Sequence, residues 1–134
     1  MFWLSKMSIN KNNPETNLQK QRNIVLNHWI LQKVSALVLI PLGIWFLFML
    51  KDFLYYDFTN KILWFKNFYN SLLLSIFLLV SIFHLRLGLT VVIEDYIHSL
   101  KRKKTLLSFL EILYLFLAVF TVIIIFILYM GYNV

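Results

Sequence analysis

Long apolar blocks separated by short polar segments dominate the chain. One uncharged run covers 34–50, a second apolar block extends from 71 to about 93, and a third begins near 106 and continues toward the C-terminus. The first run alone would form about 25 Å of α-helix, close to the thickness of a bilayer's hydrocarbon core. The pattern predicts an all-α membrane protein with three transmembrane helices, at about 34–50, 71–96 and 106–130.

The composition agrees with lipid as the solvent of these blocks. Of the 134 residues, 60% are hydrophobic and 14% are charged, whereas a soluble domain usually carries about 25% charged residues. The chain has no cysteine, which excludes a disulfide framework, a thiolate metal site and a cysteine nucleophile. We therefore expect a polar N-terminal segment, 1–33, followed by one membrane anchor domain, 34–130.

The basic residues predict which ends of the helices face the inner side of the membrane. The segment 1–33 carries five Lys and Arg residues against one acid, and the connection at 99–105 carries four and no acid. By the positive-inside rule, the N-terminus and this connection lie inside, in the matrix or cytoplasm, and the C-terminus lies outside. The net charge is +7, and the basic residues flank the apolar runs. This arrangement indicates membrane topology and not nucleic-acid binding.

An ionisable side chain within a membrane helix is costly and needs an explanation, and His84 is the first of three. A neutral histidine at this depth suits a metal or a haem iron, or else it is a core histidine that bonds a neighbouring helix. Gly88 lies on the same face and leaves room either for a flat macrocycle or for close helix packing. His28 and His98 are too far along the chain to reach an iron at His84, so a second axial ligand would come from another chain.

Arg86 and Glu111 are the other two ionisable residues inside the predicted spans. At 100° per residue, Arg86 points about 160° away from His84. It pairs with an acid on another helix or reaches a water-filled crevice, and Glu111 is either its partner or a residue that lies near the headgroups. For both we favour a structural pairing role over a proton path.

Asp95 and Tyr96 end the second predicted helix at the boundary between lipid and water. A tyrosine hydroxyl beside a carboxylate can donate to a carbonyl of a lipid-soluble head group such as a quinone. The alternative is an interfacial tyrosine next to a helix-end acid. The residues alone leave both open.

Two segments resemble one known family. The segment 84–98, HLRLGLTVVIEDYIH, resembles the second membrane helix of the hydrophobic anchor (D) subunits of succinate dehydrogenase, respiratory complex II. The segment 28–36, HWILQKVSA, with LIPL at 39–42, resembles the start of that family's first helix. The likeness covers about 26–130 and does not include the N-terminal 25 residues.

The resemblance implies site residues and cofactors. His84 would be an axial ligand of a haem b shared with the other anchor subunit, and Tyr96 would donate a hydrogen bond to a ubiquinone carbonyl with Asp95 supporting it. Lys33 stands where the family usually has an arginine near the haem propionates; it keeps the charge and loses the bidentate fork.

The resemblance also implies partners and a location. The chain would have no catalytic residue of its own and would assemble with a flavoprotein subunit, an iron–sulfur subunit and a second membrane anchor, the cytochrome b subunit. Its place would be the mitochondrial inner membrane or the bacterial cytoplasmic membrane. The rival interpretations are the anchor of a fumarate reductase and a structural accessory subunit of another respiratory complex.

Overall fold

Residues 14–131, the part of the chain that this computed structural model describes, form an all-helical structure. Its helices are α2 (Pro14–Tyr55), α3 (Phe58–Lys66), α4 (Phe68–Tyr96) and α5 (Leu100–Met130). Apart from the short α3, these helices are long and apolar enough to cross a membrane. The predicted all-α architecture with three spans is therefore confirmed.

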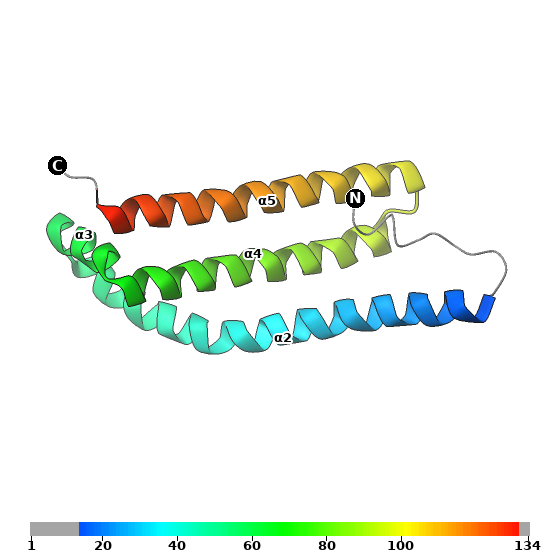
Figure 1. Ribbon diagram of the computed structural model, residues 1–134, viewed down its shortest axis with the longest axis horizontal. Helices are drawn as coiled ribbons and strands as arrows, with labels where there is room; N and C mark the ends of the chain where they lie inside the picture. The colour runs from blue at the N-terminus through cyan, green and yellow to red at the C-terminus, as the bar shows by residue number, and fades with distance from the viewer. Residues whose placement is uncertain (1–13, 132–134) are drawn as a thin grey trace.

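The three long helices lie side by side in one layer, with α4 between α2 and α5 (Figure 1). Each runs antiparallel to its neighbour. The start of α2 and the α4–α5 connection consequently lie at one end of the layer, and α3 and the end of α5 lie at the other. The basic residues near the start of α2 and those at the start of α5 thus lie at the same end.

The first long helix extends well beyond the uncharged run that predicted it. It begins at Pro14 and ends at Tyr55, whereas the run covers 34–50. At 1.5 Å per residue its 42 residues measure about 63 Å, roughly twice the hydrocarbon thickness of a bilayer. The helix is therefore longer than a single crossing needs, and its first half contains the polar segment 14–33. Glu15 in its first turn complements the positive end of the helix dipole.

The connection at 51–70 contains a helix that the hydrophobic pattern did not predict. Asp57 caps the start of α3 by accepting a hydrogen bond from the Asn60 amide at 3.1 Å. Asn67 ends α3 and caps α4, accepting from the Tyr69 amide at 3.0 Å. Gly131 closes α5 with a φ of +68°, a conformation that favours glycine.

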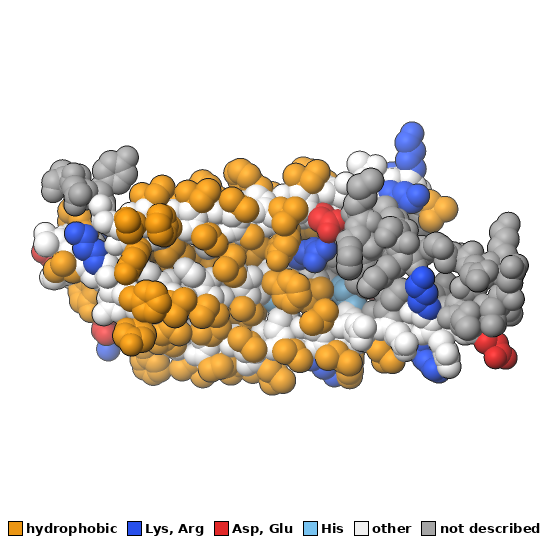
Figure 2. All heavy atoms as spheres, in the orientation of Figure 1, with side chains coloured by type: hydrophobic (Ala, Val, Ile, Leu, Met, Phe, Trp, Pro, Cys, Tyr) orange, Lys and Arg blue, Asp and Glu red, His pale blue; other side chains and the backbone are white. Residues whose placement is uncertain are grey.

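Packing between the helices is sparse and of the membrane type. Among the described residues, the buried side chains are Leu87, Leu110 and Ile125 together with two serines, Ser35 and Ser71. Small residues allow helices to approach closely where lipid, not water, surrounds them. Hydrophobic side chains cover the middle of the molecule, as Figure 2 shows. This surface fits lipid or the helices of other subunits.

Candidate functional site

His84 contacts the neighbouring helix through one of its two ring nitrogens. It lies on α4, half-buried, with Nδ1 at 2.8 Å from the Ser35 hydroxyl oxygen on α2. Ser35 is only 5% exposed, and its hydroxyl also donates to the Gln32 carbonyl at 2.9 Å. The imidazole is therefore held from the Nδ1 side by a group with a fixed position.

Gly88 lies one turn beyond His84 on the same side of α4 and faces α2. A Cβ atom built there would be 3.8 Å from the Gln32 side-chain nitrogen, an ordinary van der Waals distance. Gln32 and Ser35 thus meet Gly88 and His84 in antiparallel register. The small residue allows α2 to approach α4 at this level, as the helix-packing alternative for Gly88 expects.

The opposite side of α4 carries an ion pair to α5. Arg86 Nη2 lies 3.2 Å from Glu111 Oε1, with side-chain exposures of 21% and 30%. The guanidinium carbon is also 5.1 Å from the centroid of the Tyr114 ring, within cation–π range. The predicted pairing of Arg86 with Glu111 is confirmed, and so is its direction, away from the face that His84 presents to α2.

Asp95 and Tyr96 are the last two residues of α4. Both are exposed, Tyr96 by 77%, and no hydrogen bond to either side chain is found within residues 14–131. The helix rise separates them from His84 by about 17 Å along α4. The structure therefore does not bring them together with His84, but it leaves the phenol and the carboxylate available to another molecule.

Lys33 lies on α2 next to the level of Ser35. Its Nζ is 3.6 Å from the centroid of the Trp29 ring, a cation–π contact along the same helix. Lys33 and Ser35 are two residues apart in the helix, so their side chains point about 160° apart, and Lys33 lies on the far side of α2 from α4. Lys33 therefore lies at the same level along the helices as His84, but its side chain points away from His84.

The remaining histidines lie elsewhere. His28 is half-buried on α2, and His98 is exposed between α4 and α5. Within the described part of the chain, no three His, Asp or Glu side chains come together as a ligand group for a metal ion. An iron held by His84 would thus take its remaining ligands from other molecules.

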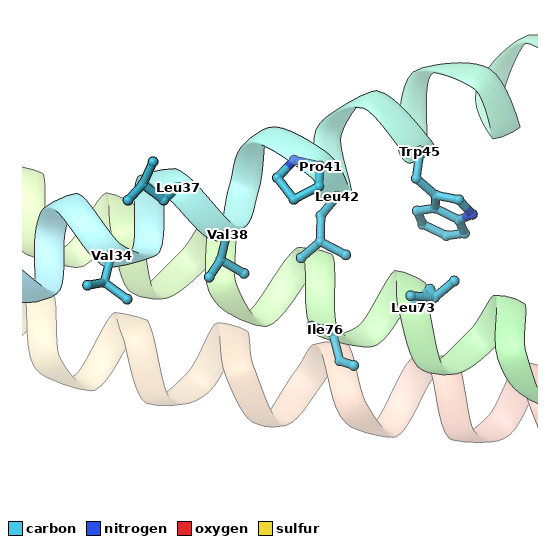
Figure 3. Close-up of a pocket in the computed structure, with 8 residues that line it drawn as sticks. All are labelled: Val34, Leu37, Val38, Pro41, Leu42, Trp45, Leu73 and Ile76. Atoms are coloured by element: carbon cyan, nitrogen blue, oxygen red, sulfur yellow. The ribbon is translucent and has the colours of Figure 1, made fainter.

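An open groove of about 610 Å³ runs between α2 and α4 toward the α3 end. In Figure 3, Trp45 of α2 lies opposite Leu73 of α4 across this groove. The lining residues are Val34, Leu37, Val38, Pro41, Leu42, Trp45, Leu73 and Ile76. None of them titrates, so the groove offers apolar packing and no acid–base chemistry.

Sequence reasoning missed Ser35 and Gln32 as members of the site. A serine near the start of an apolar run carries no charge, and hydroxyls commonly bond their own helix in a membrane. The available signal was small-residue spacing: Ser35 on one helix and Gly88 on another are the residue types that let membrane helices approach closely.

Comparison with known proteins gives a consistent picture. The family model for succinate dehydrogenase/fumarate reductase transmembrane subunits matches residues 9–128. The chain is similar to the succinate dehydrogenase hydrophobic membrane anchor subunit of Rickettsia typhi, 37% identical over 93 residues, covering 64% of this chain and 69% of the relative. The corresponding protein of Rickettsia felis is 33% identical over 100 residues, covering 69% and 78% of the two chains.

A more distant relative points the same way. The succinate dehydrogenase membrane anchor subunit of Reclinomonas americana is 32% identical over 79 residues, covering 57% of this chain and 66% of the relative. No solved structure matches the chain.

Proposed function

Because the chain belongs to the succinate dehydrogenase/fumarate reductase transmembrane subunit family, we propose that it supplies one axial ligand, His84, to a haem b and one hydrogen-bond donor, Tyr96, to ubiquinone. Its general role is that of a membrane anchor subunit of succinate dehydrogenase, a multi-pass protein of the mitochondrial or bacterial inner membrane. The proposal adds chemistry to that role.

The surroundings of His84 carry the haem part of the proposal. A histidine that binds a metal normally bonds a fixed acceptor through its other ring nitrogen, and Ser35 occupies that place at Nδ1. Nε2 is then the nitrogen that binds iron. When bound, a haem supplies a one-electron redox centre whose potential depends on its axial ligands. Lys33 lies at the depth of His84 but on the far side of α2 from α4, so its part in the proposal is a positive charge acting on the propionates from a distance.

The end of α4 carries the quinone part of the proposal. The Tyr96 hydroxyl is a donor at the polar end of an apolar helix, and Asp95 precedes it as a hydrogen-bond acceptor. Their exposure fits a site that is completed by other subunits. In this arrangement Tyr96 orients a quinone carbonyl and Asp95 supports the polar side of the pocket.

The proposed partners follow from the same role. Family membership implies a complex with other complex II subunits. We assign succinate oxidation to a flavoprotein subunit, electron delivery to an iron–sulfur subunit, and the second haem ligand to another membrane anchor, the cytochrome b subunit. This chain then holds the membrane end of the complex and has no oxidation chemistry of its own.

We also propose that the α4–α5 connection and the start of α2 face the inner side. The two segments lie at the same end of the layer, and four basic residues at 101–104 follow directly after the connection, at the start of α5. Basic segments next to membrane helices stay preferentially on the inner side. Tyr96 then lies on the side from which an iron–sulfur subunit would approach.

Replacing His84 tests the haem assignment in the purified complex. His84→Ala removes the ligand nitrogen, so we expect the b-type haem absorption band to disappear from the reduced-minus-oxidised spectrum. His98→Ala is the matched control, since His98 is exposed in the connection, and it is expected to keep the band. An unchanged spectrum in His84→Ala would refute the assignment.

Replacing Tyr96 tests the quinone assignment separately. Tyr96→Phe removes only the hydroxyl, and loss of one hydrogen bond is expected to reduce the quinone reductase rate by up to about tenfold. Succinate oxidation with an artificial acceptor stays unchanged. Tyr69→Phe, which alters an exposed tyrosine at the other end of α4, is the control. Wild-type quinone turnover in Tyr96→Phe removes this residue from the site.

The absence of native cysteine allows a direct test of orientation. Ser99 and Asn60 are exposed at opposite ends of the layer, so each can be replaced by cysteine and labelled in sealed vesicles with a membrane-impermeant thiol reagent. We expect Ser99→Cys to react only from the inner side and Asn60→Cys only from the outer side. The reverse pattern would overturn the proposed orientation.

A further inference from the structure

The Ser35 hydroxyl joins two helices at the proposed haem ligand. It lies on α2, 5% exposed, between its own helix and the imidazole of His84. Its oxygen is 2.9 Å from the Gln32 carbonyl oxygen and 2.8 Å from His84 Nδ1. Among the described residues, this is the hydrogen bond that links α2 to a ring nitrogen of His84.

The single proton of the Ser35 hydroxyl determines which ring nitrogen of His84 carries a hydrogen. A serine hydroxyl has one proton and two lone pairs. The Gln32 carbonyl can only accept, so the hydroxyl proton is donated to it. Ser35 then offers a lone pair to His84, and Nδ1 must carry the ring proton. In a neutral imidazole this leaves the lone pair on Nε2, the nitrogen that can bind iron.

We propose that Ser35 is a positioning residue that fixes the tautomer and orientation of His84 for haem ligation. This inference rests on the proposed function, because it concerns how the ligand is held and not whether His84 is the ligand. Ser35 does not touch the iron. It acts through the His84 Nδ1–H, whose hydrogen bond makes Nε2 a stronger electron donor.

Gln32 and Gly88 support the same arrangement from either side. The Gln32 carbonyl fixes the direction of the Ser35 proton, while the Gln32 side chain lies 3.8 Å from the place where a Gly88 Cβ would be. The first contact lies within α2, and the second lies between α2 and α4 one turn from His84. The hydroxyl is thus presented by packed backbone and not by a flexible side chain.

Removing the hydroxyl is expected to shift the haem midpoint potential, which distinguishes it from simple loosening of the helices. A donor stronger at Nε2 stabilises ferric iron, so loss of the Nδ1 hydrogen bond is expected to raise the haem midpoint potential. Loss of a supporting partner of a metal-ligating histidine typically weakens metal affinity by about 10- to 100-fold. Haem retention is therefore expected to fall in the same variant.

The experiment uses the purified complex with Ser35 replaced by Ala, Thr or Val. Thr and Val have the same shape and differ in the hydroxyl, so their comparison separates the hydrogen bond from packing. We expect Ser35→Ala and Ser35→Val to raise the midpoint potential, measured by redox titration of the b-type band, and to release haem faster to an excess of haem-binding apoprotein. Ser35→Thr is expected to keep the wild-type potential.

Ser75→Ala provides the matched control, since Ser75 donates to the Ser71 carbonyl on α4 in the same manner but away from His84. It is expected to leave the potential unchanged. If Ser35→Thr and Ser35→Val share one potential, the hydroxyl does not act on His84 and the inference is overturned. If His84→Ala removes the haem band in that same case, the proposed function stands without it. If His84→Ala keeps the band, the proposed function itself fails.

Discussion

The polar side chains on the two sides of α4 differ in the partners that they have. On the side toward α5, Arg86 and Glu111 form an ion pair, and the Tyr114 ring covers the guanidinium. On the side toward α2, His84 bonds Ser35 through Nδ1 alone, while Nε2 has no hydrogen-bond partner within residues 14–131. The first side pairs its charges inside the chain, and the second leaves Nε2 without a hydrogen bond from the described residues, as the proposed haem ligation needs.

The difference is the one we expect between a structural ion pair and the proposed haem ligand. Lipid makes a lone charge costly, and an ion pair between neighbouring helices reduces that cost while fixing their register. A neutral histidine has no charge to compensate, so it can remain in the membrane with a hydrogen bond to only one of its two ring nitrogens. A histidine held rigidly at one nitrogen and open at the other has the arrangement that metal ligation requires.

Breaking the ion pair is expected to give the largest loss of stability. Arg86→Leu removes the guanidinium that pairs with Glu111 between apolar helices, which we expect to cost about 3 kcal/mol, the lower end for a buried pair because the side chains are 21% and 30% exposed. The thermal midpoint of the purified complex measures it. Arg102→Leu, at an exposed site in the first turn of α5, is the control.

The double variant sharpens this result. Arg86→Leu with Glu111→Leu removes both charges, and apolar packing is expected to recover most of the lost stability. If the double variant is as unstable as Arg86→Leu, then the pair is not an isolated unit and Arg86 has a further partner. If Arg86→Leu alone is as stable as the wild type, the pair contributes nothing to α4–α5 packing.

A smaller effect is expected on the other side of α4. Gly88→Leu pushes against Gln32 and separates α2 from α4, at an expected cost of about 1–3 kcal/mol with weaker haem retention. Gly88→Ala is the control, because a Cβ fits at 3.8 Å from Gln32. Haem loss in Gly88→Ala would show that the space is needed by a group outside the chain rather than by α2.

The smallest effect is expected at Lys33. Lys33→Gln removes one positive charge and the Trp29 contact, worth about 0.5–1 kcal/mol at an exposed site. If the charge lies near the propionates, the haem midpoint potential falls slightly, because ferric iron is then better balanced. Lys33→Arg keeps the charge and the wild-type potential. Equal potentials in Lys33→Gln and Lys33→Arg would remove Lys33 from the haem site.

The spans and the ion pair were predictable because both follow from the free-energy cost of placing charged groups in lipid. Long uncharged runs fix the number of membrane helices, and a charge inside a span needs a partner or water, so an Arg86–Glu111 pair was one of the alternatives that the sequence offered and the structure selects it. The 160° separation of Arg86 from His84 needed only helix geometry.

Other features depended on information that one sequence does not carry. The segment 14–33 has no continuous apolar face, so its helix in α2 left no periodic signal, and α3 depends on caps at Asp57 and Asn67. The contact between Ser35 and His84 depends on the register of α2 against α4. That register is set by close packing of small residues, which a hydrophobic pattern does not specify.

Haem content measured side by side in two variants separates the two sides of α4 directly. The complex is purified with His84→Ala and, in parallel, with Arg86→Leu combined with Glu111→Leu, and haem b is quantified per complex. We predict loss of haem in the first and wild-type haem in the second. Full haem in His84→Ala, or equal loss in both, would contradict the assignment of the α2 side to haem ligation and of the α5 side to structure.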